Sequence, residues 1–207
     1  MTVYLEIHPE NPQPRLIARA AEVFRAGGVV VYPTDSSYAL GCQIGEKNAL
    51  DRIRMLRRVD DKHNFTLVCR DLSEIATYAR IDNSAYRQLK SLTPGPYTFI
   101  YQATKQVPRR LLHPKRRAIG IRVPDAPIVR ALLAELDQPI LSTTLILPGD
   151  QSPLNDPYEI RETIGHCVDL VIDGGHCGSE PTTVVDMTQD PAVLVRAGKG
   201  DTALFEG

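Results

Sequence analysis

Small hydrogen-bonding side chains directly follow an apolar segment near the N-terminus. Val29 to Tyr32 are β-branched or aromatic, which is typical of a buried strand. Residues 33–38, "PTDSSY", then carry five hydroxyl or carboxylate groups. Such groups, with backbone amides, bind the phosphate, carboxylate or hydroxyl groups of small ligands. Serine and threonine also close turns and cap helices, so this segment alone leaves both interpretations open.

Hydroxyl groups recur at three further points where a strand is expected to begin or end. "TPGPYT" at 93–98 is a rigid turn, "PIL" at 139–141 runs into "STT", and a loop before "VVDM" contains "PTT". In open α/β sheets, ligands bind beyond the strand ends, where loop groups converge. Four such places together favour a binding site over unrelated turns and caps. The residues concerned are Thr98, Ser142, Thr144, Thr182 and Thr183.

Basic residues form two clusters, although the formal net charge is −1. The first cluster comprises Arg52, Arg54, Arg57, Arg58 and Lys62, and the second Lys105, Arg109, Arg110, Lys115, Arg116 and Arg117. Segregated positive charge suits the phosphates of a nucleotide or of RNA. Two solvated surfaces beside acidic residues would give the same pattern. Because aromatic residues are few and tryptophan is absent, an RNA ligand is expected to be double-stranded.

Common catalytic and nucleotide-binding motifs are absent from the sequence. It contains no GxxxxGK[ST] loop, no GxGxxG and no GxSxG, so a bound nucleotide would need a non-standard site. No covalent nucleophile is assigned. The adjacent pairs His166-Cys167 and His176-Cys177 would point to opposite faces of a strand, and we predict no metal site.

Alternating helical and strand patterns position these residues. Helices are predicted at 11–26, 47–58, 71–79, 83–91, 125–136 (capped by Asp125) and 156–165. Strands are predicted at 28–32, 65–69, 97–104, 118–123 and 139–144, with three more near the C-terminus. This order predicts an α/β (α+β) chain with one twisted mixed sheet and flanking helices, in one domain over residues 1–207. No apolar run is long enough to span a membrane, and the first residues do not resemble a signal peptide, so we expect a cytoplasmic protein.

Five segments together resemble the YrdC/YciO family. "VVVYPTDSSYALGC" resembles its "YPTETxYGLG" signature, "TPGPYTFI" its "PGPxT" turn and "IGIRVPDAPI" its "xxRxP" strand. "LSTT" resembles "STSAN", and "EPTTVVDMT" with "VLVRAGKG" resembles the closing "PSTIxD…xxRxG" segment. The matches follow the family's order over about residues 15–200, and "KHNFTLVCRDLSE" resembles the YciO branch.

The resemblance implies a mixed sheet around a large, positively charged concave cavity. It also implies threonylcarbamoyl-AMP synthase activity, in which L-threonine, bicarbonate and ATP with Mg²⁺ give threonylcarbamoyl-AMP and pyrophosphate for tRNA modification. Family members have also been described as binding double-stranded RNA or tRNA. Carried over by motif, threonine contacts fall on Thr34, Tyr38, Thr98, Arg122, Thr182 and Thr183, and nucleotide-phosphate contacts on Arg57, Arg58, Ser142, Thr144 and Arg196.

Two positions depart from the family's phosphate-binding pattern. Its KxR pair falls on Arg57 and Val59, and its SxN pair on Thr144 and Ile146. Valine supplies no charge and isoleucine no side-chain hydrogen bond. Each charge-assisted hydrogen bond contributes roughly 1.5–3 kcal/mol, so losing two would cost on the order of two to four decades in affinity or rate. Arg58, next to Val59, is a candidate substitute for the missing arginine.

Three functional hypotheses follow from these residues and the resemblance. In the first, the chain is a synthase of this type with weakened activity, which works by positioning and charge neutralisation. In the second, it binds an RNA duplex through a basic surface at Arg109, Arg110, Lys115, Arg116 and Arg117. In the third, it keeps the family's architecture and has lost the activity.

Overall fold

The strands of the chain join into one sheet with helices packed around it. The computed structural model describes residues 2–60, 63–112 and 117–205. The strands are β1 Val3–Glu6, β2 Val30–Tyr32, β3 Ala39–Gln43, β4 Thr66–Val68, β5 Tyr97–Gln102, β6 Ala118–Arg122, β7 Ile140–Thr144, β8 Leu170–Asp173, β9 Thr183–Asp186 and β10 Val193–Arg196. The helices are α1 Pro14–Arg25, α2 Lys47–Arg57, α3 Leu72–Tyr78, α4 Asn83–Leu92, α5 Pro127–Leu136 and α6 Pro157–Ile164, with 3-10 turns at Arg109–Leu111 and Gly165–Cys167.

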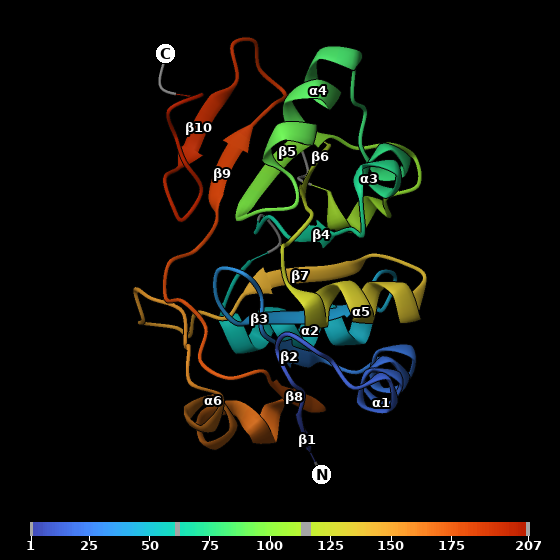
Figure 1. Ribbon diagram of the computed structural model, residues 1–207, viewed down its shortest axis with the longest axis vertical. Helices are drawn as coiled ribbons and strands as arrows, with labels where there is room; N and C mark the ends of the chain where they lie inside the picture. Colours follow the sequence, from blue (N-terminus) through green and yellow to red (C-terminus); the bar gives the residue numbers. More distant parts are fainter. Residues whose placement is uncertain (1, 61–62, 113–116, 206–207) are drawn as a thin grey trace.

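Parallel and antiparallel pairs alternate irregularly across the sheet. Within the described residues its order is β1-β8-β2-β3-β7-β4-β6-β5-β9-β10 (Figure 1). Parallel pairs join β1 to β8, β8 to β2, β4 to β6 and β5 to β9, and the other neighbours are antiparallel. This confirms the predicted mixed sheet. Residues 33–38 connect β2 to its antiparallel neighbour β3, so the polar segment forms the loop of that strand pair.

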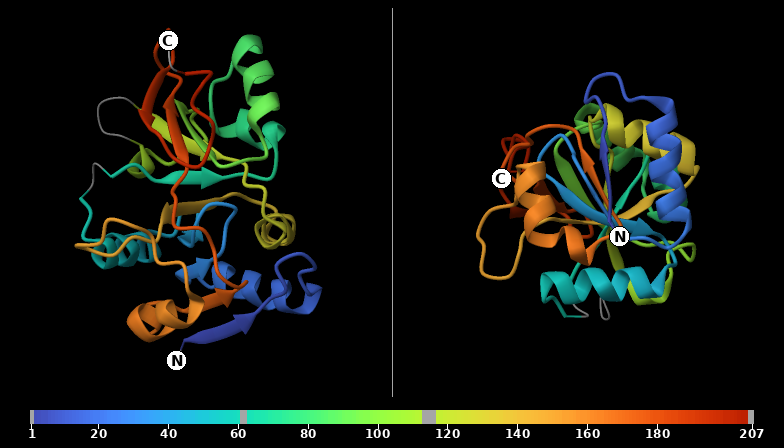
Figure 2. Two further views of the ribbon diagram at one scale, coloured as in Figure 1. Left: turned by 60° about the vertical axis from the view of Figure 1, so that its left-hand side comes forward. Right: turned by 90° about the horizontal axis from the view of Figure 1, so that it is seen from below.

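Two buried clusters hold the helices against the sheet. One contains side chains of α1 and α5, such as Phe24 and Leu132, together with Val30 of β2. The other contains side chains of α2 and α6, such as Ile53, together with Val31 of β2. Because successive strand residues point to opposite faces, the clusters lie on opposite sides of β2. Seen from below, the strands run through the middle of the molecule with helices around them (Figure 2).

The predicted helices and all the predicted strands are confirmed, but two further strands among the described residues were not anticipated. β1 pairs with β8 at one edge of the sheet, and β3 lies between β2 and β7. Gly41 interrupts the apolar pattern of β3. A Cβ atom there would lie 2.7 Å from the Tyr32 ring and 2.8 Å from Ile140. Glycine is therefore required by close packing at a position where it would otherwise indicate a strand break.

The predicted capping of the fifth helix by Asp125 is wrong. The residue before the first turn of α5 is Ala126, whose side chain makes no capping hydrogen bond. Instead, the Asp125 backbone N–H donates to the Asp35 carboxylate at 3.0 Å, so this segment is tied to the polar loop after β2. Asp156, by contrast, caps α6 by accepting from the Tyr158 N–H, as its sequence position indicates.

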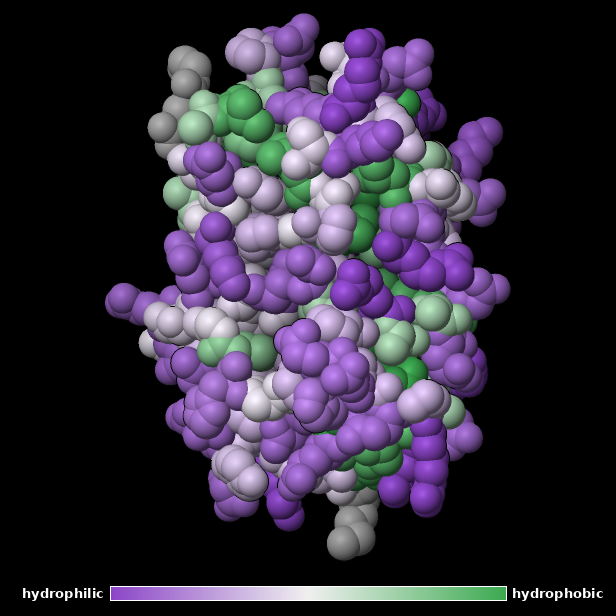
Figure 3. Space-filling model, in the orientation of Figure 1, coloured by the Kyte–Doolittle hydropathy of each residue, from purple (hydrophilic) through white to green (hydrophobic). Residues whose placement is uncertain are grey.

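The outer surface is mostly hydrophilic on the face seen in Figure 3, with smaller hydrophobic areas between the polar side chains. The exposed large apolar side chains include Val193 and Val195 of the edge strand β10. No described helix is both long enough and apolar enough to cross a membrane.

Candidate functional site

A row of cross-strand neighbours forms the floor of a cavity. Ser142 of β7 pairs with Thr66 of β4, and Thr66 also pairs with Gly120 of β6. Gly120 in turn pairs with Ile100 of β5. Directly opposed residues point to the same face of a sheet, and these four line one cavity of about 440 Å³. At Gly120 a Cβ atom would lie 2.9 Å from the Thr66 hydroxyl, so glycine leaves room at this point of the floor.

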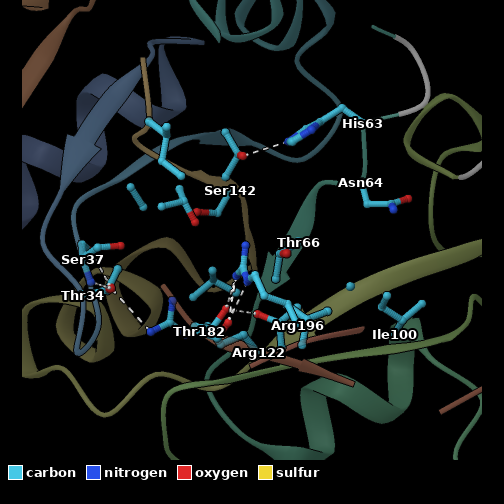
Figure 4. A pocket seen from close by; sticks show the side chains of 18 of the residues that line it. Thr34, Ser37, His63, Asn64, Thr66, Ile100, Arg122, Ser142, Thr182 and Arg196 are labelled. Carbon is cyan, nitrogen blue, oxygen red and sulfur yellow. Dashed lines mark hydrogen bonds between the residues drawn. The ribbon is translucent and has the colours of Figure 1, made fainter. Parts of the chain in front are cut away.

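Hydroxyl groups and arginines supply most of the polar lining (Figure 4). The hydroxyls belong to Thr34, Ser37, Thr66, Thr98, Ser142, Thr143, Thr144 and Thr182, and the arginines are Arg57, Arg122 and Arg196. Among the described residues, no acidic side chain lines this cavity. A concave site with fixed positive charge and many hydrogen-bonding groups is suited to an anionic ligand.

The arginine at the end of β6 anchors the loop between β2 and β3. The Arg122 guanidinium forms an ion pair with Asp35, and the two side chains are 9% and 10% exposed. It also donates to the Ser36 hydroxyl at 3.1 Å, while its Nε is buried with no partner among the described residues. Arg122 therefore shapes the loop with one part of its guanidinium and keeps donor capacity beside the cavity.

Thr34 closes a local turn, whereas Tyr38 lies outside the cavity lining. The Thr34 hydroxyl donates to the Ser37 carbonyl at 2.6 Å and accepts from the backbone N–H groups of Ser36 and Ser37 at 3.2 Å. Tyr38 is fully buried, and its hydroxyl donates to the Gly175 carbonyl at 2.7 Å. The structure thus gives Thr34 a place on the cavity wall and gives Tyr38 a packing position beneath the loop.

A second hydrogen-bonded group combines β5 with the C-terminal strands. The hydroxyls of Thr98 and Thr182 lie 3.0 Å apart, and Arg196 donates to the Thr182 carbonyl at 2.8 and 3.1 Å. Arg196 itself is exposed at the cavity rim. Partial burial lowers the pKa of Arg196, and the nearby charge of Arg122 adds to this effect.

Thr183 does not share the cavity position of its neighbour Thr182. Its hydroxyl donates to the Gly200 carbonyl at 2.6 Å and accepts from the Gly198 N–H at 3.1 Å. Thr182, just before β9, and Val184 of β9 line the cavity, whereas Thr183 fixes the C-terminal segment.

The predicted phosphate end is formed by the end of α2, by β7 and by the segment that follows β7. Ser142 and Thr144 line it, and Ser142 accepts from the buried Tyr32 hydroxyl at 2.6 Å. Arg57, the last residue of α2, donates to the backbone carbonyl of Ile146, and its Nε is buried with no partner among the described residues. Burial lowers the pKa of Arg57. A charged group and several hydroxyls are therefore retained here.

The departures from the family pattern have different positions in the structure. The Ile146 side chain belongs to the cavity lining, so an apolar surface replaces a polar one at this point. Val59 does not line the cavity. Arg58, the candidate substitute, ends α2 in a left-handed conformation with an exposed side chain, and it does not line the cavity either.

His63 and Asn64 also line the cavity, and motif comparison did not assign them a role. The His63 Nε2 lies 3.0 Å from the Thr143 hydroxyl, and its ring meets Phe65 edge-on at 5.2 Å between centroids. Burial is the main reason why the pKa of His63 falls to about 4, and the charge of Arg57 contributes. The "KHN" sequence is a visible signal, but it became informative only when the fold brought it beside β7.

The described residues of the second basic cluster lie outside this cavity. Arg109, Arg110 and Arg117 are exposed, and Arg110 donates to the Gly45 backbone carbonyl. Lys115 and Arg116, also predicted to contact RNA, lie outside the described residues. The described part of the cluster is therefore a surface feature, separate from the three arginines of the cavity.

Comparison of the sequence with known families and proteins gives consistent matches. The Sua5/YciO/YrdC family, described as "Telomere recombination", matches residues 22–198. The chain is 56% identical over 205 residues to the uncharacterized protein YciO of Escherichia coli K12, covering 99% of this chain and all of the relative. A putative threonylcarbamoyl-AMP synthase of Methanocaldococcus jannaschii is 29% identical over 173 residues, covering 83% of this chain and 80% of the relative.

Solved structures extend the same similarity to three dimensions. The crystal structure of E. coli YciO superposes with a TM-score of 0.96 and covers 99% of this chain and 100% of the YciO chain. The crystal structure of P. abyssi Sua5 complexed with L-threonine superposes with a TM-score of 0.87 at 25% identity. That match covers 95% of this chain but 58% of the Sua5 chain, so Sua5 contains a large additional part.

Proposed function

Because the chain belongs to the Sua5/YciO/YrdC family, we propose that it is a nucleotide-binding synthase that forms threonylcarbamoyl-AMP with reduced efficiency. Its substrates would be L-threonine, bicarbonate and ATP, and its second product pyrophosphate. The observation that carries the proposal is a single cavity lined by Arg57, Arg122, Arg196 and eight hydroxyl side chains. A putative synthase among its relatives and the binding of L-threonine by P. abyssi Sua5 support it.

The amino-acid end of the cavity is assigned to Arg122, Thr98 and Thr182. A nearly buried arginine that lines the cavity is suited to a carboxylate. The neighbouring hydroxyls of Thr98 and Thr182 can exchange donor and acceptor roles, as recognition of the threonine hydroxyl or amine requires. Thr34 contributes by holding the turn that positions the wall, because its own hydroxyl is already engaged.

The phosphate end is assigned to Arg57, Ser142 and Thr144, with Arg196 at the rim. These residues would neutralise and orient the phosphates of ATP while the carbamate attacks the α-phosphate and pyrophosphate leaves. No covalent nucleophile is needed. Mg²⁺ would enter with ATP as part of the substrate and would offset part of the phosphate charge.

Pyrophosphate release by the purified protein tests this function. We expect a slow release from ATP and Mg²⁺ that depends on both L-threonine and bicarbonate. L-Valine is the matched control, because it replaces the substrate hydroxyl with a methyl group. If release is absent while an intact synthase is active in the same assay, or if it does not depend on threonine, the proposed reaction is wrong.

Binding of a double-stranded RNA backbone is a second candidate, favoured by the exposed side chains of Arg109 and Arg117. It predicts an affinity that falls steeply with salt and depends little on sequence. The double variant Arg109→Glu and Arg117→Glu should then reduce duplex binding at least tenfold, with Arg19→Glu and Arg87→Glu as charge-matched controls on other exposed surfaces. Equal affinities for both double variants would exclude this surface.

A further inference from the structure

His63 differs from the other charged or titratable side chains of the cavity because it can change its charge near neutral pH. The described lining otherwise contains three arginines, which stay protonated in proteins, and no carboxylate. His63 lies between α2 and β4, on the opposite side of the close-up view from Arg122 and Arg196 (Figure 4). If ligand binding near pH 7 changes the protonation of a lining side chain, that side chain is therefore most readily His63.

Two contacts fix the orientation of the His63 ring. Its Nε2 is hydrogen-bonded with the Thr143 hydroxyl at 3.0 Å, and its plane is nearly perpendicular to the Phe65 ring, at 86°. Thr143 is itself buried beside Ser142 and Thr144, on the strand that supplies the phosphate end. The ring is thus held at the phosphate end by two neighbours that carry no charge.

The charges around the ring oppose its protonation while the cavity is empty. Burial is the strongest contribution against the imidazolium, followed by the charge of Arg57. Asp60, after α2, favours the imidazolium, and Arg54 of α2 disfavours it by a smaller amount than Asp60 favours it. On the β7 side the ring meets the uncharged Thr143. Asp61 and Lys62, its neighbours in the chain, lie outside the described residues. Burial and the neighbouring arginines therefore favour the neutral imidazole at pH 7 when no anion is bound.

We propose that His63 contacts the anionic part of the ligand next to Arg57 and gains a proton when that anion binds. This inference deepens the proposed function and rests on it, since it assumes that the cavity binds phosphate groups. The bound anion would offset the charge of Arg57 and stabilise the imidazolium. His63 would then supply, only in the bound state, a positive contact at the end of the cavity where Val59 supplies none.

The coupling makes ligand affinity depend on pH in a defined direction. Above the bound-state pKa of His63 the proton is absent from both states, and the extra affinity disappears. As the pH falls from 8 to 6, the bound state takes up a proton and affinity rises by roughly two- to tenfold because of His63. His63→Gln keeps a hydrogen-bonding side chain but cannot titrate, so it should lose this part of the pH dependence.

Calorimetric titration with inorganic pyrophosphate tests the coupling. Wild type, His63→Gln and the matched control His166→Gln, an exposed histidine outside the cavity, would each be titrated at pH 6, 7 and 8 in two buffers of different ionisation heat. Wild type and His166→Gln should take up the same number of protons on binding. His63→Gln should take up fewer, because the proton gained by His63 is missing. The titration of pyrophosphate itself is common to all three proteins and cancels in the comparison.

Proton NMR of the His63 ring supplies a measurement that does not depend on how well a variant folds. The His63 resonance, identified by its loss in His63→Gln, should titrate at least two pH units higher with saturating pyrophosphate than without it. If pyrophosphate binds and this titration does not move, the inference about His63 is wrong while the anion-binding cavity stands. If pyrophosphate does not bind wild type at all, both the inference and the assignment of the phosphate end are wrong.

Discussion

The two ends of the cavity differ in how their polar groups are held. At the amino-acid end, Arg122, Thr98 and Thr182 contact Asp35, Ser36 and Arg196, so each polar group is fixed by a neighbouring side chain. At the phosphate end, Arg57 is held by a backbone carbonyl, and Ile146 presents an apolar side chain. Under the proposed function, this difference favours a retained amino-acid site and a phosphate site with fewer polar groups.

The largest effect is expected from breaking the ion pair at the amino-acid end. Arg122→Met leaves the nearly buried Asp35 carboxylate without its cation, which we expect to lower the free energy of unfolding by about 3–5 kcal/mol. Urea denaturation measures this change. Arg130→Met, which removes an exposed arginine from a 3.7 Å ion pair with Asp125, is the control and should cost less than about 1 kcal/mol. Similar values for both variants would contradict the structural role of Arg122.

Restoring a polar group at the phosphate end should strengthen ATP binding. Ile146→Asn places an amide in the cavity lining, where one added hydrogen bond to a charged phosphate should raise affinity about tenfold or more. Val59→Arg should have a smaller effect, since Val59 does not line the cavity. Equilibrium titration with ATP and Mg²⁺ compares the two variants. A larger gain in ATP affinity from Val59→Arg than from Ile146→Asn would show that Val59, not Ile146, is the more important departure from the family pattern.

A moderate effect is expected on the stability of the protein at acidic pH, and it comes from His63 at the phosphate end. The folded-state pKa of His63 is about 4, below its ordinary value of 6.5, so the unfolded chain binds more protons between these values. Stability contributed by neutral His63 is complete above pH 6.5 and falls as the pH drops toward 4. We expect His63→Gln to reduce the loss of stability between pH 7 and pH 5 by about 1 kcal/mol, allowing for partial exposure.

Thermal unfolding of wild type and His63→Gln at pH 7 and pH 5, with His166→Gln as the control, checks this prediction. The difference between pH values should shrink only for the His63 variant. An unchanged difference would mean that His63 titrates normally in the folded protein.

The smallest effect is expected at Arg58, the candidate substitute for the missing arginine, which has an exposed position outside the cavity. Arg58→Ala should change the affinity for ATP less than about twofold, whereas Arg57→Ala should reduce it at least tenfold. Parallel ATP titrations measure both. A tenfold loss in Arg58→Ala would show that this side chain reaches the ligand and substitutes for the missing arginine after all.

Sequence periodicity predicted the helices, most of the strands and the mixed sheet, because apolar spacing follows burial. It missed β3, where Gly41 is required by contact with Tyr32 and Ile140, and tertiary packing of that kind leaves no local pattern. Motif resemblance located the segments that form the cavity, but it did not show which side chains in those segments point into it. Thr182 and Thr183 share one motif, yet only Thr182 lines the cavity.

The contribution of His63 could not be derived from its sequence neighbours. Its place in the cavity depends on the contact with Thr143, 80 positions later in the chain. Tyr38 illustrates the opposite case, in which a motif residue is buried beneath the loop and bonded to Gly175. The assembled sheet determines which way a side chain points and which distant residues it contacts. The positions of His63 and Tyr38 could therefore be found only from the structure.

The most direct test of the account compares threonine-dependent pyrophosphate release by wild type and Ile146→Asn in one assay with ATP, Mg²⁺ and bicarbonate. A preserved amino-acid end with a weakened phosphate end predicts slow, threonine-dependent release by wild type and a rate at least tenfold higher for Ile146→Asn at subsaturating ATP. Release that is absent in both proteins, or that ignores L-threonine in both, would contradict the account.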